Sequence, residues 1–206
     1  MTVAISEELR LRQIRAQYDN ESITVYQAYN ADIAKSAVSS QTFVSPPFKM
    51  GRMTWIKPSF LWMMYRSGWA TKEGQEHILR IKLKREGFDW AVRHSCLSHF
   101  DPRVHSSYEE WKANLANAPV RVQWDPDRDL YLQPLEQRAI QIGLSGIAVE
   151  KYITAWIVEI SDITEVCYSI KRSLDKGDVE DCYRKLPMEY PYKLAEDLKK
   201  FTGVLT

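Results

Sequence analysis

Residues 52–69 have the sequence RMTWIKPSFLWMMYRSGW, which predicts a strand that leads directly into a helix. Strand character ends at Ile56, and Pro58 suits the first helical turn because that position needs no backbone N–H donor. Gly68 suits the end of the helix because glycine adopts the left-handed conformation easily. The segment therefore predicts a strand over residues 52–56 and a short helix over residues 59–67.

The same segment contains three tryptophans, two other aromatic residues and three methionines. Apolar residues at helical spacing usually pack as core, and truncation of a buried Trp62 to alanine would then cost about 3–5 kcal/mol of stability. Lys57 has no role in such a core. It stands at the strand-to-helix junction, where backbone N–H groups and the positive end of the helix favour an anion. The segment predicts either core packing or a site for a flat ring joined to phosphate.

Periodicity and capping signals extend this description outward along the chain. Alternating apolar residues predict strands over residues 22–29, 79–84, 120–124 and 139–144, and we expect the basic strand 79–84 to be an edge or a cleft wall. Capping residues and apolar stripes predict helices over residues 6–14, 31–38, 107–114, 146–157, 162–177 and 192–201. We find no repeat or linker. Residues 1–206 are therefore expected to form a single α+β domain with a helical carboxyl-terminal cap.

Composition and short motifs argue against several classes of protein. The 206 residues include 28 Lys and Arg against 27 Asp and Glu, which argues against a broad basic surface for nucleic acid. The three cysteines form no CxxC pair and the four histidines form no HExxH motif, so no metal site is expected. The amino terminus lacks the apolar core of a secretory signal, and no apolar stretch reaches about 18 residues. The longest apolar stretch, residues 147–163, contains charged residues and has helical periodicity, so it predicts a packed soluble helix. We expect a cytoplasmic protein with no membrane partner.

Polar residues within the predicted strands are further candidates for a site. Gln27 shares a strand face with apolar residues, so its amide must be hydrogen-bonded either within the protein or to a ligand. Gln141 and Gly143 point away from the core side of their strand, where a glycine permits close approach of a ligand. The sequence DPDRD at residues 125–129 predicts a turn, and it lacks the glycine and glutamate of a calcium-binding loop.

Four stretches together carry a family resemblance. They are IRAQYD with TVYQAY, RMTWIKPSFLWMMYRSGW, VRVQWDPDRD and AIQIGL, and over nearly the whole chain they resemble domain of unknown function 4291. More remotely, that family resembles the ADP-ribosyltransferase superfamily. The resemblance implies a compact split β-sheet of the ADP-ribosyltransferase type with flanking helices. Its cleft would hold NAD, cleave the nicotinamide bond and pass ADP-ribose to an acceptor.

The superfamily resemblance also implies roles for individual residues. Members carry an arginine or histidine on a first cleft strand, a hydroxyl residue on a second and a glutamate on a later one. Here the later strand offers Asp125, and Glu76 is the alternative acid that would stabilise a ribosyl cation. Arg15, Lys57 or Arg138 would hold the pyrophosphate, and Tyr26 or Trp55 would stack on nicotinamide. The remaining expected NAD contacts are Tyr18, Gln27, Thr54, Ser59 and Gln141.

The leading hypothesis is an NAD-dependent ADP-ribosyltransferase-like enzyme that modifies a protein, nucleic acid or nucleoside. An alternative is a non-catalytic module that binds a nucleotide or single-stranded nucleic acid between aromatic faces and a few cations. In a third interpretation the aromatic segment is only core, and the protein acts through a surface partner. Lys57 separates these hypotheses, because Lys57→Met should weaken a phosphate-bearing ligand without loss of stability only if Lys57 lies in a cleft.

Overall fold

A computed structural model describes residues 11–204, and in this part of the chain eight α-helices accompany three β-sheets. The strands are β1 (Arg15–Ala16), β2 (Ser22–Tyr29), β3 (Thr54–Ile56), β4 (His77–Lys84), β5 (Ser95–Leu97), β6 (Val120–Arg128), β7 (Pro134–Leu144), β8 (Ile157–Asp162) and β9 (Tyr190–Pro191). The helices are α2 (Ala31–Ser40), α3 (Phe60–Ser67), α4 (Arg85–Arg93), α5 (Tyr108–Asn117), α6 (Ile147–Lys151), α7 (Thr164–Asp175), α8 (Val179–Lys185) and α9 (Glu196–Thr202), and a π-helical turn, η1 (Tyr152–Trp156), follows α6. The expected mixed α+β composition is confirmed.

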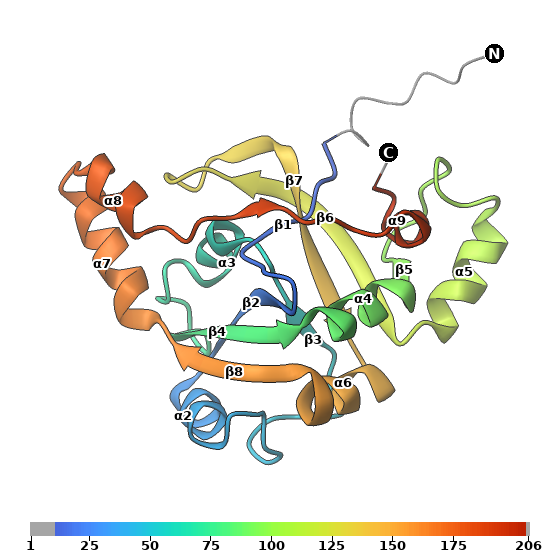
Figure 1. Ribbon diagram of the computed structural model, residues 1–206, viewed down its shortest axis with the longest axis horizontal. Coiled ribbons are helices and arrows are strands. Elements are labelled where there is room, and N and C mark those ends of the chain that lie inside the picture. The colour runs from blue at the N-terminus through green and yellow to red at the C-terminus, as the bar shows by residue number, and fades with distance from the viewer. Residues whose placement is uncertain (1–10, 205–206) are drawn as a thin grey trace.

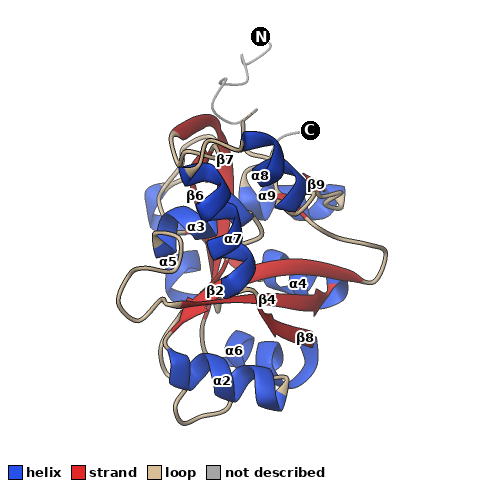
Figure 2. Ribbon diagram, turned by 90° about the vertical axis from the view of Figure 1, so that its left-hand side faces the viewer, coloured by secondary structure: helices blue, strands red, loops and turns tan. Residues whose placement is uncertain are grey.

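Two sheets form the centre of the molecule. One has the order β2-β4-β8 and the other the order β3-β7-β6-β5, and the strands of one run across those of the other (Figures 1 and 2). Strands β2 and β3 meet at an isolated antiparallel bridge, in which the Tyr26 N–H donates to Lys57 O at 2.8 Å and the Lys57 N–H donates to Tyr26 O at 3.2 Å. The predicted strand-to-helix junction therefore lies where the two sheets meet.

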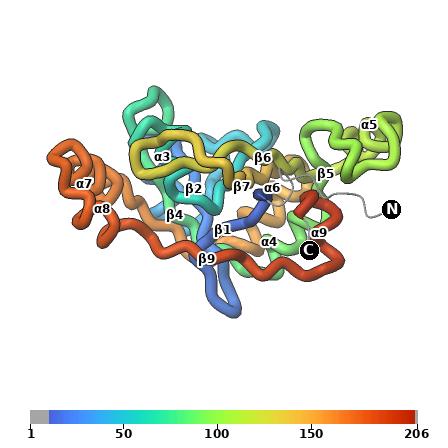
Figure 3. Tube along the Cα trace, turned by 90° about the horizontal axis from the view of Figure 1, so that it is seen from above, coloured from blue at the N-terminus to red at the C-terminus, as the bar shows by residue number. Residues whose placement is uncertain are grey.

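A third, two-stranded sheet lies across this meeting point. Strands β1 and β9 pair antiparallel, and the chain around β1 also touches both larger sheets through the bridges Arg12–Arg138 and Tyr18–Ile23. Seen from above in Figure 3, β1 and β9 lie between α7 and α8 at one end of the molecule and α5 at the other. The segment before β2 and the segment after α8 are thus brought together although they are distant in sequence.

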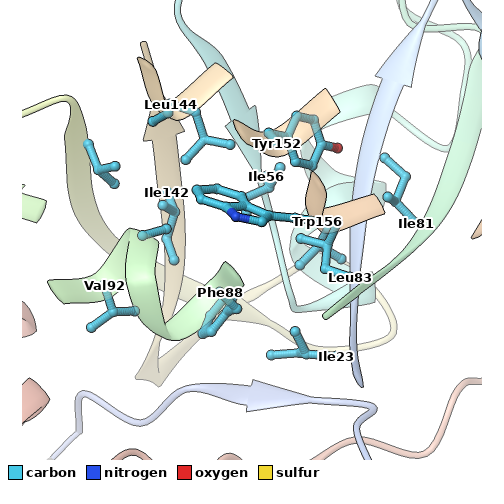
Figure 4. Close-up of a cluster of buried hydrophobic side chains, with 14 of the residues drawn as sticks. Ile23, Ile56, Ile81, Leu83, Phe88, Val92, Ile142, Leu144, Tyr152 and Trp156 are labelled. Atoms are coloured by element: carbon cyan, nitrogen blue, oxygen red, sulfur yellow. The ribbon is translucent and has the colours of Figure 1, made fainter. Parts of the chain in front are cut away.

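The main core fills the space between the two larger sheets. Apolar side chains of β2 and β4 meet those of β3, β6 and β7, and Phe88, Tyr152 and Trp156 complete the cluster. Figure 4 shows the indole of Trp156 among Ile56, Ile142 and Leu144. Gly87 of α4 makes room for that indole, because a Cβ at Gly87 would lie 2.3 Å from Cγ of Trp156.

A second buried cluster confirms the core interpretation of the aromatic segment for most of its side chains. Phe60, Met63, Met64 and Trp69 pack with Tyr26 and with apolar residues of α7 and α8. Trp62 is also buried, with 4% of its surface exposed. Lys57 and Trp55 belong to neither cluster.

Local capping signals placed several helices correctly. The Ser59 side chain caps α3 by accepting from the Trp62 N–H, and Gly68 ends that helix with a φ of 60°. Asn30 caps α2 by accepting from the Ile33 N–H, and Ser107 caps α5 by accepting from the Glu110 N–H. Each cap satisfies a backbone donor that the helix itself leaves free, and for this reason the signal is readable from sequence.

Other predictions were wrong because tertiary pairing overrode local pattern. The helix predicted over residues 146–157 is helical through Trp156, as α6 and η1, but residues 157–162 of the apolar stretch 147–163 form β8 against β4 instead of continuing the helix. Strand β4 is consequently the middle strand of its sheet and not an edge. Within residues 11–204 no helix has both the length and the apolar character to cross a membrane.

The sequence DPDRD was also predicted wrongly. Residues 125–128 continue β6, with Asp125 opposite Ala139 and a register shift between Pro126 and Arg128, so the turn comes later. The last helix begins at Glu196 and not at residue 192, because the Tyr192 N–H donates to Ile14 O.

The helix predicted over residues 6–14 lies mostly outside the described residues. Its last part, Gln13 and Ile14, is not helical, and β1 begins directly afterwards. Because Ile14 O accepts from the Tyr192 N–H, this part of the chain is held by pairing with a distant segment.

Candidate functional site

The predicted site residues do not form one cleft, because the structure divides them between two pockets that share no lining residue. The larger, of about 510 Å³, is lined by Gln27, Thr54, Trp55 and Lys57 together with Arg52 and Arg66, and we call it the cation pocket. The smaller, of about 350 Å³, is lined by Arg15, Ser59, Asp127 and Glu189, and we call it the carboxylate pocket. Helix α3 contributes to both, with Phe60 and Leu61 in the carboxylate pocket and Met63 and Arg66 in the cation pocket.

A closed hydrogen-bond network forms one wall of the cation pocket. The Gln27 Nε2 donates to Thr54 Oγ1 at 2.6 Å and to the Tyr29 hydroxyl at 3.0 Å, while the buried Tyr152 hydroxyl donates to Gln27 Oε1 at 2.7 Å. Burial raises the pKa of Tyr29 to about 12, so its hydroxyl stays protonated. Of the two options for the Gln27 amide, the structure supports partners within the protein.

Lys57 is the most buried charged residue of the cation pocket, with 7% of its surface exposed. Its Nζ donates to Trp55 O at 3.1 Å, and no carboxylate of the described residues lies within ion-pair distance. Burial lowers the pKa of Lys57 to about 7, the charge of Arg66 lowers it further, and Asp125 opposes the shift. Residues 11–204 likewise give Arg52 and Arg66 no ion-pair partner. The pocket therefore concentrates positive charge that the protein itself does not neutralise.

Strand β7 contributes the surface behind Trp55. A Cβ at Gly143 would lie 3.0 Å from two ring carbons of Trp55 and 2.7 Å from Sδ of Met53, so the glycine accommodates these side chains and not a ligand. Two residues away, the Gln141 Nε2 donates to Asp125 Oδ2 at 2.8 Å, and the Gln123 Nε2 donates to the other oxygen at 3.1 Å. Asp125 is thus held by two amides and lines neither pocket.

The carboxylate pocket is built around the start of α3. The Ser59 hydroxyl donates to Asp127 Oδ1 at 3.0 Å, and the N–H of the next residue, Phe60, donates to Glu189 Oε1 at 2.7 Å. Asp127 comes from β6, and Glu189 comes from the segment between α8 and β9. Two acids from distant parts of the sequence therefore converge on consecutive residues. The start of α3 thus already has a carboxyl group of this protein, that of Glu189, as a hydrogen-bond acceptor.

The environment of this pocket raises the pKa of both acids. Burial raises the pKa of Glu189 to about 8, and the neighbouring charge of Asp127 adds to the shift. Burial also raises the pKa of Asp127, against the hydrogen bonds from Arg128 N–H and Ser59. The Arg15 guanidinium opposes both shifts and donates to Glu189 O at 3.1 Å. Two cations, Arg15 and Arg128, thus line a pocket with two acids, and burial raises the pKa of Glu189 to about 8.

The acids chosen from sequence were not the acids of this pocket. Glu76 lies beside a separate small pocket with Asn30 and His77, and its Oε1 accepts from the Gly74 N–H at 2.8 Å. Asp127 is two positions beyond Asp125 on the same strand, and the register shift at that point turns it toward Ser59. Because DPDRD was predicted to form a turn, Asp127 was not recognised as a site residue. Glu189 has no local signal, because only the fold brings it to α3.

The remaining predicted residues lie outside both pockets. Tyr26 is buried in the second core cluster against Phe60, so it is not available to stack on a ligand. The Tyr18 hydroxyl donates to Pro191 O at 2.8 Å and ties the β1 region to β9. Arg138 pairs with Arg12 through the backbone at the start of the described chain. These three residues contribute to packing and chain pairing.

Comparison with known proteins gives a relative and a family. Over 76 residues the chain is 29% identical to the uncharacterized protein YPR053C of Saccharomyces cerevisiae, an alignment that covers 37% of this chain and 42% of the yeast protein. The chain thus spans less than half the length of this curated relative. A family model matches residues 13–192, which include both pockets almost entirely. The chain therefore belongs to the family described as domain of unknown function (DUF4291).

Proposed function

We propose that this protein transfers ADP-ribose from NAD to an acceptor and that the carboxylate pocket is where the nicotinamide bond is cleaved. The observation that carries the proposal is the convergence of Asp127 and Glu189 on Ser59 and the Phe60 N–H. The resemblance of the sequence motifs to the ADP-ribosyltransferase superfamily supports the same reaction. So does the arrangement of two sheets that meet at a single bridge between β2 and β3.

The chemistry of the reaction explains why two acids are useful. When the bond between ribose C1′ and the nicotinamide nitrogen breaks, its electron pair leaves with nicotinamide and the ribose becomes an oxocarbenium-like cation. A carboxylate in a site that excludes water stabilises such a cation strongly. We assign this role to Asp127, which Ser59 holds in place through a 3.0 Å hydrogen bond.

The second acid would accept a proton from the acceptor. An incoming nucleophile must lose a proton as it bonds to C1′, and a group whose pKa lies near the working pH accepts that proton most effectively. Glu189, with a pKa raised to about 8 by burial, meets this requirement. The exposed Arg15 lines the same pocket and would hold the pyrophosphate.

The test is nicotinamide release from labelled NAD by the full chain, alone and with protein, RNA, DNA and nucleosides as acceptors. We expect Asp127→Asn and Glu189→Gln each to reduce release by about 100-fold or more. Asp125→Asn and Glu76→Gln are matched controls that also remove one carboxylate, and they should retain release because neither residue lines the carboxylate pocket.

Three results would contradict the proposal. Absence of both nicotinamide release and calorimetric NAD binding would exclude NAD as the substrate. Loss of release in Asp125→Asn with retention in Asp127→Asn would place the chemistry elsewhere. Stoichiometric NAD binding without release under all acceptor conditions would identify a binding module instead of an enzyme.

A further inference from the structure

Positively charged residues outnumber acids among the residues that line the cation pocket. Lys49 and Arg52 precede β3, Lys57 follows β3 and Arg66 belongs to α3, so four cations from three separate parts of the chain line the same pocket. Glu73 is the acid among the residues that line it, and its side chain is exposed. In the described part of the chain, none of these four cations makes an ion pair.

The burial of Lys57 makes this excess of positive charge energetically unfavourable. A buried ammonium without a paired anion is strongly unfavourable, and a single hydrogen bond to Trp55 O does not compensate for it. Asp125, whose charge acts on Lys57, is already held by the amides of Gln123 and Gln141. The protein therefore arranges an anion near Lys57 but does not pair the two.

Other features of the pocket suit a ligand and not merely a counterion. Its volume of about 510 Å³ lies in the range of small-molecule sites. The Trp55 ring lines it and is fixed against Gly143, and Thr54 and Gln27 are fixed by their shared hydrogen bond of 2.6 Å. An aromatic face and rigid polar groups beside these cations match a small molecule that carries both a phosphate group and an apolar or aromatic part.

We propose that the cation pocket binds a small phosphate-bearing molecule through Lys57, Arg52 and Arg66. This proposal does not depend on ADP-ribosyl transfer, because the two pockets share no lining residue. The phosphate would supply the anion that Lys57 lacks, and Arg52 and Arg66 would bind its remaining oxygens from the exposed side.

The test uses calorimetry on the full chain with three probes: inorganic phosphate, AMP and adenosine. We expect phosphate and AMP to bind and adenosine not to bind. AMP affinity above that of phosphate would mean that the pocket also holds the ring, whereas equal affinities would mean that it recognises the phosphate group alone. Both results support the proposal.

Variants then locate the site. Lys57→Met and Arg66→Gln should each weaken AMP binding by about tenfold or more, as expected for loss of a charge-assisted hydrogen bond. Arg172→Gln is the matched control, because Arg172 is an exposed arginine of α7 that lines neither pocket. Arg66 is exposed, so Arg66→Gln keeps the test valid even if another variant unfolds.

The proposal is overturned if neither phosphate nor AMP binds, or if binding is equal in the parent, Lys57→Met and Arg66→Gln. Loss of AMP binding in Arg15→Gln with retention in Arg66→Gln would also overturn it, because the phosphate would then bind in the carboxylate pocket. These results leave nicotinamide release and its dependence on Asp127 unaffected, so failure of this proposal is distinguishable from failure of the proposed enzyme activity.

Discussion

Gly87 of α4 lies directly against the indole of Trp156, so that a Cβ at Gly87 would come within 2.3 Å of Cγ and 2.5 Å of Cδ1. Glycine normally weakens a helix interior by about 1 kcal/mol relative to alanine. Here the close approach explains its presence, because it lets α4 pack onto the core between the two sheets.

Gly87→Ala should therefore destabilise the protein in spite of the better helix propensity of alanine. We expect a loss of about 1–3 kcal/mol in the free energy of unfolding, measured by urea denaturation, because overpacking displaces a buried side chain. The double variant Gly87→Ala with Trp156→Phe should show a favourable coupling energy, since the smaller ring leaves space for the new methyl group. A Gly87→Ala variant as stable as the parent would show that Trp156 moves freely.

The hydroxyl of Tyr152 holds the Gln27 amide at the wall of the cation pocket. Tyr152→Phe removes the donor and leaves Gln27 Oε1 buried without a partner, so it should cost about 1–3 kcal/mol of stability. Tyr168→Phe is a matched control, because that hydroxyl is only partly buried and donates to Ala70 O at 3.3 Å. Equal effects of the two variants in thermal unfolding would contradict the role assigned to Tyr152.

Glu189 should make the parent protein less stable as pH rises. Its pKa is raised by burial from 4.5 to about 8, so between these values the folded state binds a proton that the unfolded state has lost. The free energy of unfolding therefore falls with pH across this window, by an amount on the order of a few kcal/mol. Glu189→Gln, whose amide oxygen can still accept from Phe60 N–H, should flatten this dependence. Parallel profiles of parent and variant from pH 5 to pH 8 would contradict the assignment.

Lys57 has the opposite linkage. Burial lowers its pKa from 10.5 to about 7, so between these values the unfolded state binds the proton that the folded state lacks, and Lys57 makes stability rise with pH. Lys57→Met should remove this contribution and leave the protein as stable as the parent, or more stable, at pH 7. The difference between parent and variant is measured by denaturation from pH 7 to pH 10, with exposed Lys35→Met as control. A variant that melts far below the parent would make Lys57 a structural partner.

Local signals in the sequence were sufficient for the strand-to-helix junction and its caps. Ser59, Gly68 and Asn30 act within a few residues of their own position, so their effects could be predicted without the rest of the fold. The same reasoning failed for residues 157–162. Their apolar pattern fits a helix and a strand equally well, and the choice was made by pairing with β4.

The candidate site was predictable only in part, for the same reason. Arg15 and Ser59 line one pocket together, but local patterns offered no means to separate that pocket from the pocket of Lys57. Asp127 was hidden by a bulge that changes which side of β6 an acid points to. Glu189 reaches α3 only because β9 pairs with β1. Arg15 and Glu189, which this pairing brings together, are 174 residues apart in the sequence.

At the bridge between Tyr26 and Lys57, the backbone and the side chain of Lys57 have different roles. The peptide groups on either side of Lys57 form a seam that joins the two sheets, while the ammonium lies in the cation pocket. Replacement of the Lys57 side chain should therefore change the charge of the pocket and leave both backbone hydrogen bonds of the bridge in place.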